Sequence, residues 1–217
     1  MRTAQYGQIG AAIMSSQIDD VFQYQNKDYN ISAIENPDNF FNINDYGIPR
    51  GRCSSACWRG YMAIFGLDKD NRLVLIELYT SVRDGYTPPD INGVSPDIID
   101  MHPEDPEFFT KLPVHILIAG NVQYSFINLP IQYSGKILIT EGFIDDYYVH
   151  MGFQPPSSYG EVLELTFAKG TCVDVKDVSG QAEQKRLEMA NDNFSYGYDP
   201  DWIEKSFNLD YDSKWSD

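Results

Sequence analysis

The stretch from residue 58 to residue 79, WRGYMAIFGL-DKDN-RLVLIELY, decides the fold class of this chain. Two apolar runs of strand length, residues 58–67 and 72–79, flank the polar loop at residues 68–71. Two such runs around a short polar loop predict a β-hairpin. Because both runs are almost continuously apolar, we expect both faces of this hairpin to be largely buried.

Two further hairpins are predicted on either side of this stretch. Residues 18–34 alternate apolar and polar side chains around the polar pair Asn26 and Lys27. Residues 161–167 and 171–175 flank a short turn that contains Gly170. Strands of 4–8 residues separated by polar or glycine-containing turns are typical of antiparallel hairpins. Three further apolar runs predict single strands: residues 114–119, 122–127 and 135–141.

The C-terminal part of the sequence predicts helices. Ser179 suits the first position of a helix running to about Asn191. Pro200 suits the first turn of a second short helix. We therefore predict an α+β fold of mainly antiparallel hairpins with two short C-terminal helices. The expected organisation is a β-rich domain at residues 1–177 and a helical, acidic extension at residues 178–217 packed on it.

Charge is the most unusual property of the sequence. The 217 residues contain 32 acidic and 16 basic side chains, which gives a net charge of −16. Binding to nucleic acid or to an anionic membrane surface requires basic side chains, so we expect neither partner. A cationic protein partner is compatible with this charge. The alternative interpretation is that the charge only keeps the protein soluble and monomeric.

The cysteines and apolar segments indicate a cytoplasmic protein. Cys53, Cys57 and Cys172 are an odd number without the density of a secreted disulfide scaffold. Cys53 and Cys57 lack a second ligand pair for zinc, so we expect buried thiols and no metal. The apolar segment at residues 9–14 is shorter than the core of a secretory signal. No run approaches the roughly 20 apolar residues of a membrane span.

Established catalytic motifs are missing from the sequence. It contains no G-x-S-x-G, no phosphate-binding glycine loop and no C-x-x-C redox pair. We therefore predict no catalytic residue and no cofactor, and the balance favours a protein that is not an enzyme.

Two groups of residues nevertheless allow an alternative pocket. Asp145 and Asp146 stand near His150 and could bind a divalent metal or act as acid–base groups, although adjacent acids arise by chance in so acidic a chain. A basic cluster is either an anion site, a salt-bridge hub or simple charge balance; its members are Arg50, Arg52 and Arg59. The alternative is a small-ligand site or hydrolase pocket near Tyr147, comprising Arg59, Asp145, Tyr148 and His150.

The segment at residues 83–113 is the first candidate for a binding surface. Its six prolines interrupt regular structure, and residues 84–107 contain seven acidic side chains and no Lys or Arg. A long loop in a compact domain is either functional or a solvated insertion. We predict that a cationic partner binds at Asp97, Asp100, Glu104, Asp105, Glu107 and Phe108. Upstream, Phe40 and Phe41 are expected to anchor a turn-rich stretch to the core.

Two motifs carry a resemblance to a known family. Residues 57–61, CWRGY, and residues 148–153, YVHMGF, resemble segments of an uncharacterised family of bacterial cytoplasmic proteins. The resemblance extends over about two thirds of the chain and implies no established activity. Small acidic bacterial proteins of this kind are similar in character to immunity proteins. The predicted function is therefore a non-enzymatic inhibitor of a cationic toxin, with a ligand-binding or self-associating protein as alternatives.

Overall fold

One continuous β-sheet dominates the computed structural model, which describes residues 16–49, 51, 54–83, 85–100, 108–149, 152–191 and 207–215. Its strands are β1 (Val21–Tyr24), β2 (Lys27–Ile34), β3 (Tyr61–Leu67), β4 (Leu73–Thr80), β5 (Asp97–Ile98), β6 (Val122–Tyr124), β7 (Leu129–Pro130), β8 (Gly135–Phe143), β9 (Tyr159–Ala168) and β10 (Thr171–Asp177). The helices are α1 (Phe108–Lys111), α2 (Val114–Ala119) and α3 (Ser179–Asn191). Short 3-10 turns are η1 (Pro37–Asn39), η2 (Ile43–Tyr46), η3 (Asp145–Tyr147), η4 (Pro156–Ser158) and η5 (Ser213–Trp215).

The sheet is mixed, with the order β10-β9-β8-β2-β1-β3-β4-β6-β5 and β7 paired to β4. The three predicted hairpins are confirmed as the antiparallel pairs β1–β2, β3–β4 and β9–β10. The fold-class prediction is confirmed only in part, because β1 and β3 run parallel. Parallel neighbours need a long crossover, and the chain between β2 and β3 supplies it.

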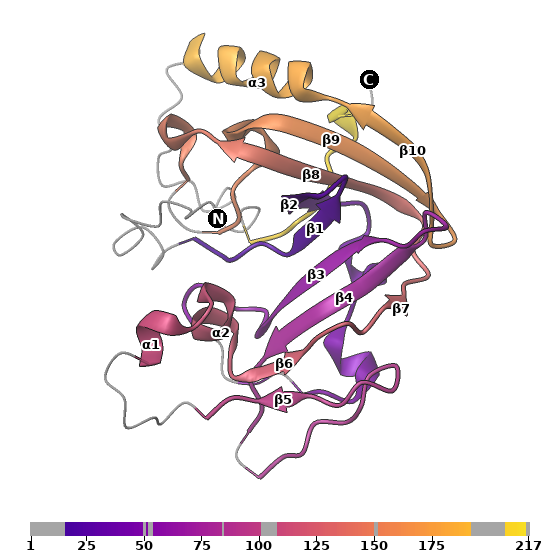
Figure 1. Ribbon diagram of the computed structural model, residues 1–217. Helices are drawn as coiled ribbons and strands as arrows, with labels where there is room; N and C mark the ends of the chain where they lie inside the picture. Colours follow the sequence, from indigo (N-terminus) through magenta and orange to yellow (C-terminus); the bar gives the residue numbers. More distant parts are fainter. Residues whose placement is uncertain are drawn as a thin grey trace.

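The sheet curls until its two halves meet at one end. Although β10 is an edge strand, Arg72 beside β4 forms a bridge with Thr171 of β10. The Leu73 amide donates to the Gly170 carbonyl at 2.8 Å. Figure 1 shows the β3–β4 half and the β8–β10 half diverging from this point. Apolar side chains of both halves form the main core, among them Phe22, Ile31, Phe65, Leu75, Ile137, Leu165 and Phe167.

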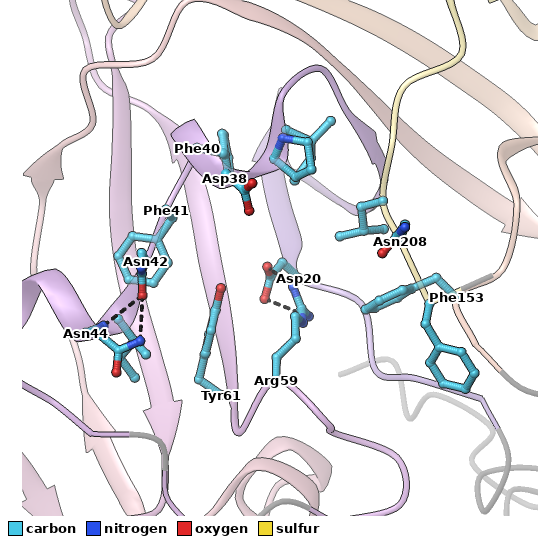
Figure 2. Close-up of a pocket in the computed structure, with 15 residues that line it drawn as sticks. Asp20, Asp38, Phe40, Phe41, Asn42, Asn44, Arg59, Tyr61, Phe153 and Asn208 are labelled. Carbon is cyan, nitrogen blue, oxygen red and sulfur yellow. Dashed lines mark hydrogen bonds and ion pairs between the residues drawn. The ribbon is translucent and has the colours of Figure 1, made fainter. Parts of the chain in front are cut away.

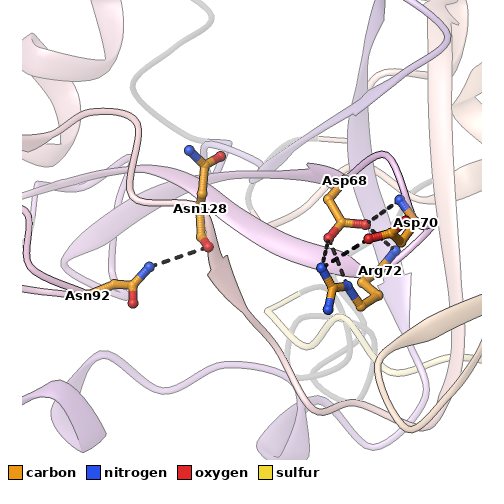
Figure 3. Close-up of polar contacts among 5 residues, drawn as sticks. All are labelled: Asp68, Asp70, Arg72, Asn92 and Asn128. Carbon is orange, nitrogen blue, oxygen red and sulfur yellow. Dashed lines mark hydrogen bonds and ion pairs between the residues drawn. The ribbon is translucent and has the colours of Figure 1, made fainter.

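Side-chain hydrogen bonds hold two of the loops (Figure 3). In the β3–β4 turn, Asp68 Oδ1 accepts from the amides of Asp70 and Arg72 at 2.8 and 2.9 Å. The Arg72 side chain pairs with the same carboxylate at 2.8 Å. In the loop before β5, Asn92 Nδ2 donates to the carbonyl of Asn128 at 3.4 Å. The carboxylate of Asp68 thus fixes the turn that joins the two strands.

The prediction of a strand at residues 114–119 is wrong, because this segment forms α2. Pro113 precedes its first turn, where a missing amide costs nothing. Ile116 and Ala119, three positions apart, are buried against the Cys57, Met62 and Tyr79 cluster. Six residues are too few to distinguish a helical period from a strand. We expected helices only in the C-terminal region, and this expectation is wrong, because α1 and α2 lie in the middle of the chain.

Helix α3 is confirmed over Ser179–Asn191, but its first turn differs in detail from the prediction. The Ser179 amide donates to Asp177 Oδ1 at 2.9 Å, and the hydrogen bonds from Ser179 lower the Asp177 pKa. Ser179 Oγ instead accepts from the Val162 amide at 3.0 Å. These bonds join the start of α3 to β9. The second predicted helix, beginning at Pro200, lies outside the described residues.

The C-terminal segment at residues 207–215, called here the tail, runs along the end of β2. The Ile34 amide donates to the Leu209 carbonyl at 2.5 Å, and the Tyr211 amide donates to the Ile34 carbonyl at 3.1 Å. The side chains of Leu209 and Trp215 are buried. Backbone pairing and two apolar anchors therefore fix the tail against the sheet. Residues 207–209 of the tail form one wall of a pocket that is described below.

Candidate functional site

A pocket of about 420 Å³ opens where the tail approaches the chain around η1 and η2. We call it the aromatic pocket. Figure 2 shows Asp38 and the hydroxyl end of Tyr61 directed into the same space, with Asp38 above and Tyr61 beside the pair of Asp20 and Arg59. The lining residues are Asp20, Ile34, Pro37, Asp38, Phe40, Phe41, Asn42, Ile43, Asn44, Arg59, Tyr61, Phe153, Phe207, Asn208 and Leu209.

Local turn chemistry shapes the wall at residues 37–46. Asn42 Oδ1 accepts from the Asn44 amide at 3.0 Å and so begins η2. Gly47 ends this turn with a φ of 75°, a left-handed conformation that favours glycine. Phe40 packs on Phe65 with ring centroids 4.9 Å apart, which confirms its predicted anchoring role. Phe41 packs on Tyr61 and Phe65, each at 5.6 Å, so it is an anchor as well.

The floor of the pocket is an ion pair between Asp20 and Arg59. Arg59 donates to both Asp20 oxygens, at 2.5 and 3.2 Å, and to the Ile18 carbonyl at 3.0 Å. Asp20 Oδ1 also accepts from the Ala63 amide at 2.8 Å. The side chains of Asp20 and Arg59 are 3% and 19% exposed. This confirms the salt-bridge interpretation for Arg59, whereas Arg50 and Arg52 lie outside the described residues.

Aromatic rings surround the guanidinium of Arg59. Its central carbon lies 5.3 Å from the centroid of Tyr61 and 5.0 Å from that of Phe153. These distances are within the range of cation–π attraction. Phe207, which lines the pocket, stacks on Trp58 with ring centroids 4.4 Å apart, and Trp58 itself is 54% exposed. The pocket therefore combines a neutralised cation with an aromatic rim.

Asp19, next to Asp20 of this floor, is a carboxyl group whose pKa is strongly raised. Burial raises its pKa from 3.8 to about 7, although the nearby charge of Arg59 opposes the shift. Asp19 Oδ1 is buried and has no hydrogen-bond partner, while Oδ2 accepts from the Tyr159 hydroxyl at 3.3 Å. Asp19 can therefore change its protonation near neutral pH.

The residues of the alternative pocket are described only in part. Arg59 lines the aromatic pocket, but Asp145 and Tyr148 do not. Asp145 is exposed in η3, and Tyr148 packs edge-on against Phe143 at 6.4 Å. His150 lies outside the described residues. A functional site formed by these four residues therefore remains a prediction.

The predicted partner-binding stretch is only partly described. Asp97, in edge strand β5, and Asp100 are both exposed. Phe108 begins α1, but its side chain is not among those described. The remaining predicted residues, Glu104, Asp105 and Glu107, lie outside the described residues. The role of this stretch in binding remains a prediction.

The cysteines agree with the expected thiols where they are described. Cys57 is free and buried, and its thiol donates to the Tyr61 carbonyl at 3.2 Å. Cys172 is free and half-buried, and Cys53 lies outside the described residues. Within the described part of the chain, no group of three or more His, Cys, Asp or Glu residues is placed to hold a metal ion. No described helix is both long and apolar enough to cross a membrane.

Sequence reasoning missed most of the aromatic pocket. Asp19 and Asp20 directly precede the first strand, but in the sequence they look no different from the exposed pair Asp145 and Asp146. Asn208, in the tail, carried no signal at all. Burial beside Arg59 distinguishes the first acidic pair from the second, and burial depends on contacts between distant segments.

No protein-family model matches the chain, and no curated protein or solved structure matches it either. The resemblance carried by the CWRGY and YVHMGF segments therefore stays a prediction.

Proposed function

We propose that this chain is a non-enzymatic binding protein for a cationic protein, acting as an immunity-type inhibitor of a bacterial toxin. The observation that carries the proposal is the excess of 32 acidic over 16 basic side chains, because many of the carboxylates are exposed. Several cationic side chains form ion pairs within the chain: Lys27 with Glu141 and Glu161, Arg59 with Asp20, Arg72 with Asp68 and Asp70, and Lys136 with Glu164.

Many carboxylates, by contrast, face solvent. Exposed acidic residues occur from β2 to the tail: Asp28, Asp38, Asp45, Asp90, Asp97, Asp145, Asp146, Asp174, Glu183 and Asp210. A surface with this charge excess attracts a cationic partner over distances of about a Debye length, ~8 Å at physiological salt. Such steering speeds association and disfavours anionic competitors.

The test uses the protein encoded by the reading frame next to this gene. Its product should be basic and should kill cells when expressed alone. Co-expression of the present chain should restore growth, because a bound inhibitor blocks the toxin without needing catalysis. Equal killing with and without the chain would contradict the proposal.

Charge reversal at the predicted stretch should weaken association with that partner. Changing Asp97, Asp100 and Glu104 to Lys should lower the association rate constant about tenfold and flatten its salt dependence. Exposed surface changes leave stability nearly constant, so the melting temperature should not move. Stopped-flow mixing at two salt concentrations measures the effect. An unaltered rate constant would place the interface on another surface.

The aromatic pocket favours a second candidate function, the binding of a small ligand. Its volume of about 420 Å³ lies within the range of ligand sites, and it combines aromatic walls with several polar side chains. Trp58, which stacks on the lining residue Phe207, should then report binding by a change in fluorescence that a Trp58→Phe variant lacks. A library of small metabolites that produces no Trp58-dependent change and no thermal stabilisation would exclude this candidate.

A further inference from the structure

A second pocket of about 370 Å³ adjoins the aromatic pocket across the tail. We call it the tail pocket. Phe153 and Asn208 line both pockets, so the two spaces meet at these side chains. The other residues of the tail pocket are Ser32, Ala33, Gln154, Pro155, Pro156, Ser157, Lys185, Asp210, Asp212 and Trp215.

The wall between the two pockets is fixed rather than loose. Ile34 holds the backbone of the tail through hydrogen bonds with Leu209 and Tyr211. Leu209 and Trp215 are buried on the two sides of this attachment. Asn208, directly before Leu209, is exposed and has an amide group that can hydrogen-bond to a peptide backbone. The arrangement provides two neighbouring subsites with a polar group between them.

The combined lining is acidic. Four aspartates, Asp20, Asp38, Asp210 and Asp212, line the two pockets together with two cations, Arg59 and Lys185. Arg59 is neutralised by Asp20. Lys185 Nζ lies 3.8 Å from the ring centroid of Trp215. The remaining carboxylates give the surroundings a negative charge that complements a cation.

The apolar lining differs between the two pockets. Phe40, Phe41 and Phe207 present rings in the aromatic pocket. Pro155, Pro156 and Trp215 form an apolar wall in the tail pocket. Each pocket is near the lower end of the size range of ligand sites, which suits a side chain or a short extended segment.

We propose that the aromatic pocket and the tail pocket together bind an extended, cationic segment of the partner protein. An Arg or Lys side chain enters the aromatic pocket beside Asp38, and an adjacent apolar side chain enters the tail pocket. Asn208 hydrogen-bonds to the backbone of the segment between them. This inference rests on the proposed function, since it specifies where the cationic partner is recognised.

Two acetylated, amidated peptides test the site directly: Ala-Arg-Ala-Phe-Ala, and the same peptide with citrulline in place of arginine. Citrulline keeps the shape of the side chain but lacks its charge. The arginine peptide should shift the amide NMR signals of Tyr61, Phe207, Asn208 and Asp210 in the intact chain. The citrulline peptide should bind about threefold or more weakly, as expected for the loss of an exposed charge pair.

Matched variants separate the site from general attraction to an acidic surface. The double variant Asp38→Asn, Asp210→Asn should weaken binding of the arginine peptide about tenfold, because both carboxylates border the pockets. The control Asp174→Asn, Glu183→Gln removes the same charge from exposed positions outside both pockets and should leave binding unchanged. Equal binding of the two peptides, shifts confined to other residues, or equal weakening by the two variants would overturn the inference.

The same variants distinguish failure of this inference from failure of the proposed function. If the neighbouring gene product binds the pocket variant and the control variant equally tightly, the segment site is wrong while the cationic-partner function stands. If that product does not bind the unmodified chain, the proposed function itself fails.

Discussion

Replacing Arg59 with Met is expected to lower the free energy of unfolding by about 3–5 kcal/mol, the cost of breaking a buried ion pair by removing one partner. The substitution removes the hydrogen bonds from Arg59 to the buried Asp20 carboxylate. The hydrogen bond from the Ala63 amide to Asp20 remains. It also removes the cation Arg59, whose charge opposes the raised pKa of Asp19. Met keeps most of the packing of the side chain against Tyr61 and Phe153, so the loss reports on charge. Urea unfolding followed by tryptophan fluorescence measures it.

Arg72→Met provides the control for this measurement. Arg72 forms its ion pairs with Asp68 and Asp70 at an exposed turn, where solvent screens the charges. We therefore expect a much smaller loss of stability than for Arg59→Met. Equal losses in the two variants would contradict a buried, stabilising pair beneath the aromatic pocket.

Replacing Asp19 with Asn is expected to stabilise the protein at pH 8 by about 2–4 kcal/mol and to have little effect at pH 4. The pKa of Asp19 is about 7 in the folded chain, against an ordinary value of 3.8. Between these two values the folded state holds a proton that the unfolded state has released. The folded state is therefore disfavoured progressively as pH rises from about 4 to about 7.

Urea unfolding of both proteins at several pH values checks this expectation. The free energy of unfolding is compared between the unmodified chain and Asp19→Asn at each pH. The contribution of the other acidic groups cancels in this difference. The difference in the free energy of unfolding should grow with rising pH and level off above about pH 7. A difference that stays constant over the whole range would show that burial does not raise the pKa of Asp19.

The hairpins were the predictable part of the fold because their evidence is local. Residues 58–79 contain both strands and the turn, and Asp68 within that turn accepts the hydrogen bonds that close it. The same holds for β1–β2 and β9–β10, whose strands are separated by two residues each. A short separation in sequence leaves antiparallel pairing as the simplest solution.

The parallel pairing of β1 with β3 could not be predicted in this way. It joins Val21 to Ile64 across the whole of β2 and the chain that follows it. The assignment of α2 failed for a different reason. Its six residues are nearly all apolar, and only the packing of Ile116 and Ala119 against Met62 and Tyr79 shows which face is buried.

The aromatic pocket was unpredictable because its walls come from segments that are far apart in the sequence. Asp20, Phe41, Arg59, Phe153 and Asn208 meet only after the sheet has curled and the tail has paired with β2. The sequence does identify Arg59 as an unusual cation and Phe41 as an anchor. It contains nothing that places Asn208 beside either of them.

Recognition of a cationic protein is tested by a calorimetric titration of the intact chain with the basic product of the neighbouring gene, at 50 and 300 mM salt. We expect a one-to-one complex with a dissociation constant of about 10 nM or lower at 50 mM salt, weakened about tenfold or more at 300 mM because clustered charges drive association. Absence of binding at the lower salt concentration, or an affinity that does not change with salt, would contradict the claim that this acidic surface recognises a cationic protein.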